Sequence, residues 1–293
     1  MRAAGRLGEI ERRLGGWDAL QEPAPPLNVQ ASNRVQASWA TVSLAGSELS
    51  LAQASKLLEG KRGLFSAREI LELENAQRAY ERAGDWEPWQ EAHLLEAHRV
   101  LLDVLSPDAG RPRKGQQGAL RSLLRASREA SDVPPIVSAI LFHYELRRIR
   151  PFSDGNGRLA RLWQHALLRR ASPLFEHAPV ESLLREQQAQ YLAAYKAATR
   201  LGSPDACLEH SLDILLLALQ RLGAQLRGRA ETAADRLAKA RRALAKRWFS
   251  RSGYLALFPE LSTASASRDL AHALAERSLS SRGQRRLTEY RFR

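Results

Sequence analysis

The sequence predicts a mostly helical protein with two domains, a large all-α domain and a small C-terminal domain of helices and strands. A chain of 293 residues can bury one large core and one small core. Apolar residues recur with helical spacing through the middle of the chain, whereas the last residues have a strand-like pattern. We place an N-terminal helix and connector at 1–30, the all-α domain at 31–226 and the small domain at 229–293.

The composition is that of an ordinary globular chain with excess positive charge. Hydrophobic residues make up 44% and charged residues 26% of the sequence, and the formal net charge is +13. With Cys207 alone no internal disulfide can form, and a reducing compartment is natural. We expect a cytoplasmic protein with no signal peptide and no contact with a membrane. The positive charge favours an acidic partner such as nucleic acid.

Prolines and apolar spacing predict the elements of the first domain. The prolines at 23–26 end the N-terminal helix and begin an extended connector. We expect helices over 120–130, from Pro135 onward with proline in the first turn, and over 212–226. Another helix begins at Asn156. Its apolar residues at helical spacing are Leu159, Leu162, Trp163, Ala166 and Leu167.

The residues just before this last helix have the composition of an anion-binding loop. Gly155 and Gly157 lack a Cβ, so backbone N–H groups can approach an oxyanion. A helix that starts at once adds its positive N-terminal end. Arg158 and Arg161 project from its first turns. The alternative is a Gly-rich turn between two core helices.

The stretch Arg-Pro-Phe-Ser-Asp-Gly-Asn-Gly-Arg-Leu-Ala-Arg, residues 150–161, resembles the signature of the Fic (Fido) family. That signature is His-Pro-Phe-x-Asp/Glu-Gly-Asn-Gly-Arg-x-x-Arg, and eight of its nine specified positions match. Members transfer AMP, or occasionally another phosphate-containing group, from a nucleotide to a protein hydroxyl. The resemblance implies an all-α Fic fold, ATP as substrate or ligand, and an unidentified protein target.

The resemblance also implies roles for individual residues. Asp154 would hold a Mg²⁺ ion that bridges the phosphates, which suits a hard, oxygen-preferring cation. Arg158 would neutralise developing charge, and Arg161 would meet the γ-phosphate. The residues implied for nucleotide binding are Gly155, Asn156, Gly157, Arg158, Arg161 and Tyr191. Tyr191 and Tyr195 lie where members place residues that close over the adenine, and stacking in the core is the alternative.

Arg150 is the first departure from the family. Members have a His at this position, which takes the proton from the attacking hydroxyl and needs a pKa near the working pH. A guanidinium stays protonated and offers only donors. Arg150 can therefore hold a phosphate or a carboxylate but cannot accept a proton. We expect it to be an inactive occupant of the general-base position.

A second departure lies at 41–46. The sequence Thr-Val-Ser-Leu-Ala-Gly resembles the family's inhibitory helix, Ser/Thr-x-x-x-Glu-Gly/Asn, in which the Glu pairs with the second motif Arg. Ala45 takes the place of this Glu, so the resemblance implies that Arg161 has no built-in lock. Two alternatives remain: Glu48 substitutes if the helix is offset, or an ordinary surface helix begins here with Thr41 as its N-cap.

A third departure precedes the motif. Members usually carry a β-hairpin flap there, onto which the target segment docks by strand addition. Residues 107–119 lead almost directly into the expected helix and leave little room for a hairpin. The chain thus lacks the general base and the inhibitory Glu, and its flap is shortened. The three differences together favour a Fic scaffold that no longer carries out adenylylation.

The last 65 residues, 229–293, contain most of the excess charge. They hold 15 Lys and Arg against 6 Asp and Glu, which gives +9 of the total +13. Helical spacing covers 231–250, followed by a short helix that ends near Pro259 and another over 263–274. Gly283 marks a tight turn before a strand-like tail. This order is the outline of a winged helix.

The tail resembles the winged-helix modules of many bacterial Fic proteins. Their recognition helix often reads Thr-Ala-Ser-Arg-Asp-Leu and their wing ends Gly-x-x-Arg-x-Thr-x-Tyr, which match 265–270 and 283–290. The resemblance implies DNA as a partner, contacted by the helix and by the wing. The candidate DNA-binding residues are Ser265, Ser267, Arg268, Arg282, Arg285 and Arg286. A solvated Arg-rich face, or a module that only contacts other domains, is the alternative.

The sequence thus favours a catalytically degenerate Fic protein that binds Mg²⁺-nucleotide and acts as a DNA-associated regulator. An active protein adenylyltransferase is the second hypothesis. A scaffold that uses neither nucleotide nor DNA is the third.

Overall fold

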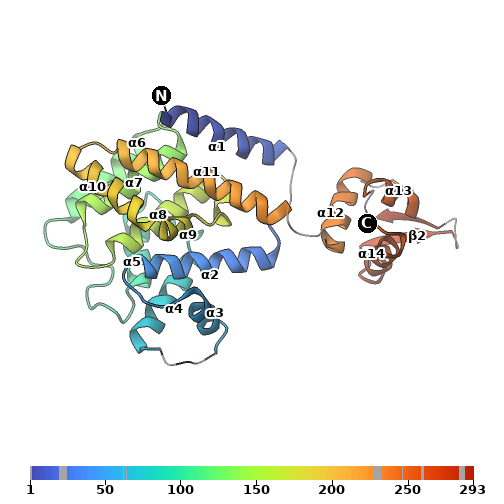
Figure 1. Ribbon diagram of the computed structural model, residues 1–293, viewed down its shortest axis with the longest axis horizontal. Helices are drawn as coiled ribbons and strands as arrows, with labels where there is room; N and C mark the ends of the chain where they lie inside the picture. The colour runs from blue at the N-terminus through green and yellow to red at the C-terminus, as the bar shows by residue number, and fades with distance from the viewer. Residues whose placement is uncertain are drawn as a thin grey trace. The chain divides into compact units, whose positions relative to one another are not determined.

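The computed structural model describes residues 2–19, 25–61, 63, 65–227, 232–245, 247–258, 261–283 and 288–293. The chain forms two compact units, Met1–Leu226 and Arg227–Arg293 (Figure 1). The described part of the first unit is helical, and that of the second combines helices with a small sheet. The predicted fold class is confirmed, and the terminal sheet is consistent with a winged domain. None of the described helices is long and apolar enough to cross a membrane.

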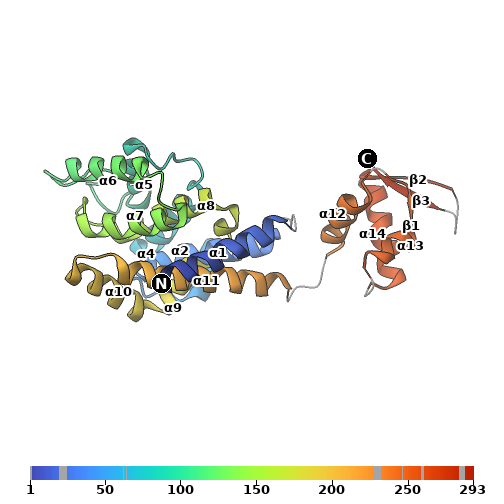
Figure 2. The same ribbon diagram turned by 90° about the horizontal axis from the view of Figure 1, so that it is seen from above.

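The first unit is built from helices and one 3₁₀ helix. They are α1 (Arg2–Ala19), α2 (Leu27–Ser43), α3 (Leu51–Leu58), α4 (Ala67–Glu81), α5 (Glu91–Leu101), α6 (Gln117–Glu129), α7 (Pro135–Ile149), α8 (Asn156–Ala171), η1 (Pro173–Glu176), α9 (Val180–Glu186), α10 (Gln188–Leu201) and α11 (Asp205–Arg227). Helix α1 lies along α11 (Figures 1 and 2), where Arg6 forms an ion pair with Asp213.

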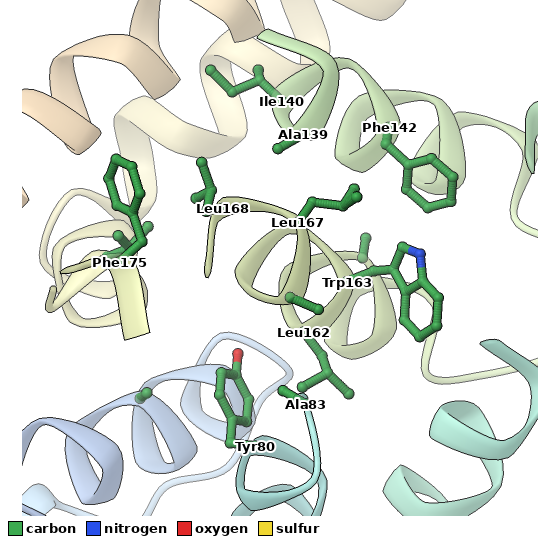
Figure 3. Close-up of a cluster of buried hydrophobic side chains, with 14 of the residues drawn as sticks. Tyr80, Ala83, Ala139, Ile140, Phe142, Leu162, Trp163, Leu167, Leu168 and Phe175 are labelled. Carbon is green, nitrogen blue, oxygen red and sulfur yellow. The ribbon is translucent and has the colours of Figure 1, made fainter. Parts of the chain in front are cut away.

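Helix α8 lies at the centre of the first unit. It packs along α7 and also contacts α2, α5 and η1. Side chains from α4, α7 and η1 lie around it in Figure 3, where Trp163 and Leu167 face α7 and Leu162 lies near α4. Trp163 is fully buried, stacks on Trp86 and donates its indole N–H to the Pro88 carbonyl at 3.2 Å. The predicted apolar face of this helix is buried, so the motif that precedes it is attached to the rigid core.

Two expectations for the N-terminal region are wrong. Helix α2 begins at Leu27, inside the expected connector, because the prolines end at 26 and the chain can turn helical at once. Thr41 is not an N-cap: it is fully buried in the last turn of α2, and the next helix starts at Leu51 with Ser50 as its cap. The Ser50 hydroxyl accepts the N–H of Gln53, whose side chain bonds back.

The second unit packs helices against a three-stranded antiparallel sheet in the order β1-β3-β2. Its elements are α12 (Ala233–Leu244), β1 (Phe249–Ser250), α13 (Arg251–Ala256), α14 (Thr263–Ala275), β2 (Leu279–Arg282) and β3 (Glu289–Phe292). Leu279 pairs with Phe292 and Phe249 with Tyr290. Leu279, Phe292 and Phe249 are buried with Leu270 of α14, so one face of the sheet covers the helices.

The helix expected over 231–250 is shorter than predicted. It ends at Leu244, and Ala245 has a left-handed backbone with φ of 47°. Trp248 therefore lies beside the sheet instead of extending the helical face, and the guanidinium groups of Arg282 and Arg291 lie 4.3 and 4.7 Å from its ring centroid. A helical spacing of apolar residues cannot exclude a break that tertiary packing imposes.

Asp269 ties the helices of the second unit together. Its buried carboxylate accepts two hydrogen bonds from Arg236 of α12, at 2.7 and 2.9 Å, and one from the Tyr254 hydroxyl of α13 at 3.1 Å. Burial, followed by the Asp269 charge, raises the pKa of Tyr254. The hydroxyl therefore stays a donor, and three elements are held by one carboxylate.

Candidate functional site

The motif loop connects the end of α7 to the start of α8. Arg150 caps α7 in a left-handed conformation with φ of 46°, and Gly155 precedes α8 with φ of 74°. The Asn156 side chain closes the loop: its Oδ1 accepts the Phe152 N–H at 3.0 Å and its Nδ2 donates to the Phe152 carbonyl at 2.9 Å. In this structure the Asn156 amide shapes the loop, which leaves backbone N–H groups at the start of α8 to meet an anion.

Two segments of the chain brace this loop from outside. The His98 ring of α5 stacks on Phe152, with centroids 3.7 Å apart and planes at 10°. Its Nε2 lies 3.0 Å from the Asp154 carbonyl, and its Nδ1 accepts the Gly110 N–H at 2.9 Å. Burial lowers the pKa of His98 to about 4. The Arg113 N–H donates to the Pro151 carbonyl at 2.7 Å.

Arg158 is a buried cation with unused donors. Its side chain is 4% exposed; Nη2 donates to Asp154 Oδ2 at 3.1 Å, and Nη1 lies 3.6 Å from Glu72 Oε1. Nε and Nη1 make no hydrogen bond with the described residues. Burial lowers the pKa of Arg158, and the charges of Asp154 and Glu72 oppose this shift. Buried donors without acceptors are costly, so this guanidinium is prepared for an anionic ligand.

Arg161 is fixed by the end of α2. Its Nε donates to the Thr41 hydroxyl at 2.9 Å and its Nη2 to the Thr41 carbonyl at 2.8 Å. Ala45 lines a cavity that opens over the motif loop, whereas the exposed Glu48 does not line it. Within the described residues no carboxylate bonds to Arg161. The resemblance of 41–46 to the inhibitory helix implied that this segment lies beside Arg161, but it pointed to position 45 as the contact and not to Thr41.

A cavity of about 480 Å³ opens over the loop. Its charged lining is strongly positive: among the described residues that line it are five arginines and Asp154, and none is a histidine. The lining residues are Leu44, Ala45, Arg147, Arg148, Arg150, Ser153, Asp154, Gly155, Asn156, Gly157, Arg158, Arg161, Tyr195 and Thr199. The sequence predicted seven of these as site residues, Arg150 among them, and missed Arg147 and Arg148, which only the end of α7 brings to the cavity.

Tyr191 lies outside this cavity. It is buried, its hydroxyl lies 2.9 Å from Nε2 of His143, and Arg147 donates to it. Tyr195, one turn later, lines the cavity instead, with the Arg147 guanidinium 4.1 Å from its ring centroid. Burial raises the pKa of Tyr195 to about 12. Spacing alone could not decide which of the two tyrosines faces the cavity.

The chain before the motif helices contains no β-strand among residues 102–116, which form turns and segments without regular secondary structure. Arg113 lies beside the motif loop, where its guanidinium also donates to the Arg150 carbonyl. Within the described residues no group of three or more His, Cys, Asp or Glu is placed to hold a metal. A metal at this site would depend on Asp154 and the ligand's own oxygens.

The candidate DNA-binding residues lie on two elements of the second unit. Arg268 is exposed on α14 and donates to the Ser265 hydroxyl at 3.1 Å; both line a groove of about 550 Å³ beside α12. The Ser267 hydroxyl accepts a hydrogen bond from Arg251 at 3.1 Å.

Other candidate residues lie on the sheet, where Arg282 forms an ion pair with Glu289 on the outer face. Arg291 lies on this face as well; it was not among the predicted DNA-binding residues, although alternation along β3 predicts its side. Arg285 and Arg286 lie outside the described residues.

Comparisons with known proteins agree on one family. Residues 88–168 match the sequence model of the Fic/DOC family. "Protein adenylyltransferase Fic" of Drosophila ananassae is 27% identical over 252 residues, and that of Drosophila virilis 28%. These alignments cover 75% of the chain, which spans about half the length of the curated relatives it matches.

Two solved structures share the fold. A Fic family protein from Desulfovibrio desulfuricans superposes with a TM-score of 0.74 at 25% identity, covering 100% of this chain and 96% of that one. Fic-1 of C. elegans, residues 134–508, gives a TM-score of 0.65 at 20% identity over 77% of this chain and 73% of that one.

Proposed function

We propose that this chain, which carries a Fic/DOC family domain over residues 88–168, binds Mg²⁺-nucleotide in the cavity above its motif loop and is degenerate as an adenylyltransferase. The observation that supports this most is the lining of the cavity. Its described charged residues offer five guanidinium groups and one carboxylate, so they attract a polyphosphate but give an attacking hydroxyl no imidazole. The volume suits a nucleotide-sized ligand.

The parts of the site fit a nucleoside triphosphate. The start of α8 offers donors to phosphate oxygens. So do Nε and Nη1 of Arg158, which are buried and make no hydrogen bond with the described residues. Nη1 of Arg161 can donate to a further phosphate, because the other two nitrogens of this guanidinium donate to Thr41. Tyr195 lines the same cavity and offers a ring against which a base can stack.

Asp154 fits a Mg²⁺ ion. Its side chain is 59% exposed and lines the cavity, so the carboxylate can bind both the ion and Arg158. Proteins commonly hold Mg²⁺ by one or two carboxylates together with substrate phosphates. The ion would neutralise phosphate charge when bound. The relatives named as adenylyltransferases support ATP as the nucleotide.

Arg158→Ala should weaken binding of α,β-methylene-ATP by about 10- to 100-fold, because a hydrogen bond to a charged group contributes about 1.5–3 kcal/mol. Isothermal titration calorimetry in the presence of Mg²⁺ measures this. Arg125→Ala is the control, since Arg125 is exposed on α6 and does not line the cavity. Equal affinity in the parent and both variants, or no binding by the parent, would exclude the proposed site.

The second unit supports association with DNA as the regulatory output. Residues 229–293 of this unit carry a net charge of +9, and Arg268 stands exposed on the helix that precedes the hairpin. Arg282 and Arg291 add two cations on the outer face of the sheet. Exposed arginines on a helix and on an adjacent hairpin are the contacts that a winged helix makes with duplex DNA.

Gel shifts of the full chain with duplex DNA should weaken steeply as salt rises, because each phosphate contact releases counterions. Arg268→Ala should lower affinity, by about 1–3 kcal/mol if Arg268 contacts a base edge. Arg277→Ala removes the same charge two residues past the C-terminal end of α14 and controls for net charge. DNA affinity that does not change with salt concentration, or an equal loss of affinity in Arg268→Ala and Arg277→Ala, would contradict this part of the proposal.

An active protein adenylyltransferase is the second candidate, and the activity named for the Drosophila relatives favours it. It requires a general base. The described lining of the cavity includes no imidazole, and its one carboxylate, Asp154, is assigned here to Mg²⁺, so the target would have to supply the base.

A further inference from the structure

His98 joins two loops through both nitrogens of one buried ring. The side chain comes from α5 and is 1% exposed. Nδ1 faces the Gly110 N–H, and Nε2 faces the Asp154 carbonyl. One partner belongs to the segment before α6 and the other to the motif loop.

The two partners determine the tautomer of the ring. A backbone N–H can only donate, so Nδ1 accepts from Gly110. A carbonyl can only accept, so Nε2 carries the proton and donates to Asp154. His98 is thus a neutral imidazole with one defined donor and one defined acceptor, and neither nitrogen is available to a metal or to a substrate.

The bond from Nε2 fixes the peptide between Asp154 and Gly155. The Gly155 N–H on the other side of this peptide donates to Asp154 Oδ1 at 2.6 Å, and Oδ2 accepts from Arg158. Turning the peptide would break both the bond to His98 and the one that orients the carboxylate. The ring also leaves little room, because a Cβ on Gly155 would lie 3.1 Å from Nε2.

We propose that His98 is a positioning residue of the nucleotide site: its Nε2–H holds the Asp154 carbonyl so that the Asp154 carboxylate faces the cavity. This inference rests on the proposed function, because the carboxylate matters there as a Mg²⁺ ligand. It adds a buried residue on α5 that touches neither the nucleotide nor the metal and acts through Asp154.

Two substitutions separate the donor from the acceptor. In His98→Gln the longer side chain can place an amide N–H near the position of Nε2, and it loses the acceptor for Gly110. In His98→Asn the shorter amide can accept from Gly110 but does not reach Asp154. Both remove the aromatic ring that stacks on Phe152, so this packing loss is matched.

The first measurement is the gain in α,β-methylene-ATP affinity when Mg²⁺ replaces EDTA, with Asp154→Asn as the reference for its loss. We expect His98→Asn to reduce this gain at least about tenfold and His98→Gln to stay within about threefold of the parent. Loss of packing alone would lower both variants equally, and that result overturns the proposal.

The second measurement needs no ligand and keeps the test independent of the proposed function. Amide hydrogen exchange over 150–157 should become at least about tenfold faster in His98→Asn, while His98→Gln remains close to the parent. If the parent binds no nucleotide, the proposed function fails and this exchange pattern alone decides the positioning role. Equal exchange in the parent and both variants refutes it.

Discussion

Arg150→His is expected to transfer AMP from ATP to a protein hydroxyl about 10²–10⁴ times faster than the parent chain, the range that a general base contributes. The parent has no imidazole among the described residues lining the cavity, and the exposed guanidinium at position 150 cannot accept a proton. Histidine tolerates the left-handed backbone of this position better than most residues do. Labelled ATP incubated with cell lysate and each protein measures the transfer.

Arg150→Gln is the matched control for this experiment. It removes the positive charge without adding a proton acceptor, so it separates relief of charge from gain of a base. We expect it to transfer no faster than the parent. Label transfer by the parent at the rate of Arg150→His would refute degeneracy and establish the second candidate function instead.

Gly155→Ala is expected to destabilise the first unit by about 2–5 kcal/mol, the sum of a left-handed backbone penalty and overpacking. Gly155 has φ of 74°, and an added Cβ would lie 2.5 Å from Leu102 Cδ2. Leu102 is fully buried and the His98 ring lies 3.1 Å from the same Cβ, so these side chains have little room to move and we expect the loop at the start of α8 to shift. Nucleotide affinity should therefore fall about 100-fold or more, at roughly 1.4 kcal/mol for each factor of ten. Thermal unfolding and calorimetry measure the two effects.

Gly202→Ala isolates the contribution of the backbone. Gly202 caps α10 with φ of 65°, and a Cβ there would meet no heavy atom within 4 Å. We expect a loss of about 1–2 kcal/mol and unchanged nucleotide binding. Equal destabilisation by the two alanines would show that the contact with Leu102 has no cost.

The sequence predicted the parts of the fold that depend on local patterns. The two glycines at the start of α8 and its apolar spacing located both the loop and the helix, because these features depend only on neighbours in the chain. The same pattern did not predict that Gln164 and His165, on the remaining faces of α8, are buried as well. Their burial comes from helices packed around α8, which a single amphipathic stripe does not encode.

The candidate site was predictable only in part for a similar reason. The motif identified Asp154 and Arg158, but the partners that hold the site together are distant backbone atoms. Thr41 binds Arg161 partly through its carbonyl, and both hydrogen bonds of the His98 ring go to backbone groups. Every residue has a carbonyl and nearly every residue an N–H, so such contacts leave no mark in the residue types.

The attachment of Arg161 to Thr41 gives the last turn of α2 a thermodynamic link to ligand occupancy. A polyanion held by the remaining nitrogen of Arg161 would make fraying of this turn more costly, and by reciprocity a factor that unwinds the turn would weaken ligand affinity equally. Ser43, in the same turn, accepts a hydrogen bond from Arg185 of α9 at 2.7 Å. Cleavage by a protease near residue 44 should then slow when a ligand occupies the motif loop, although that loop lies more than 100 residues further along the chain.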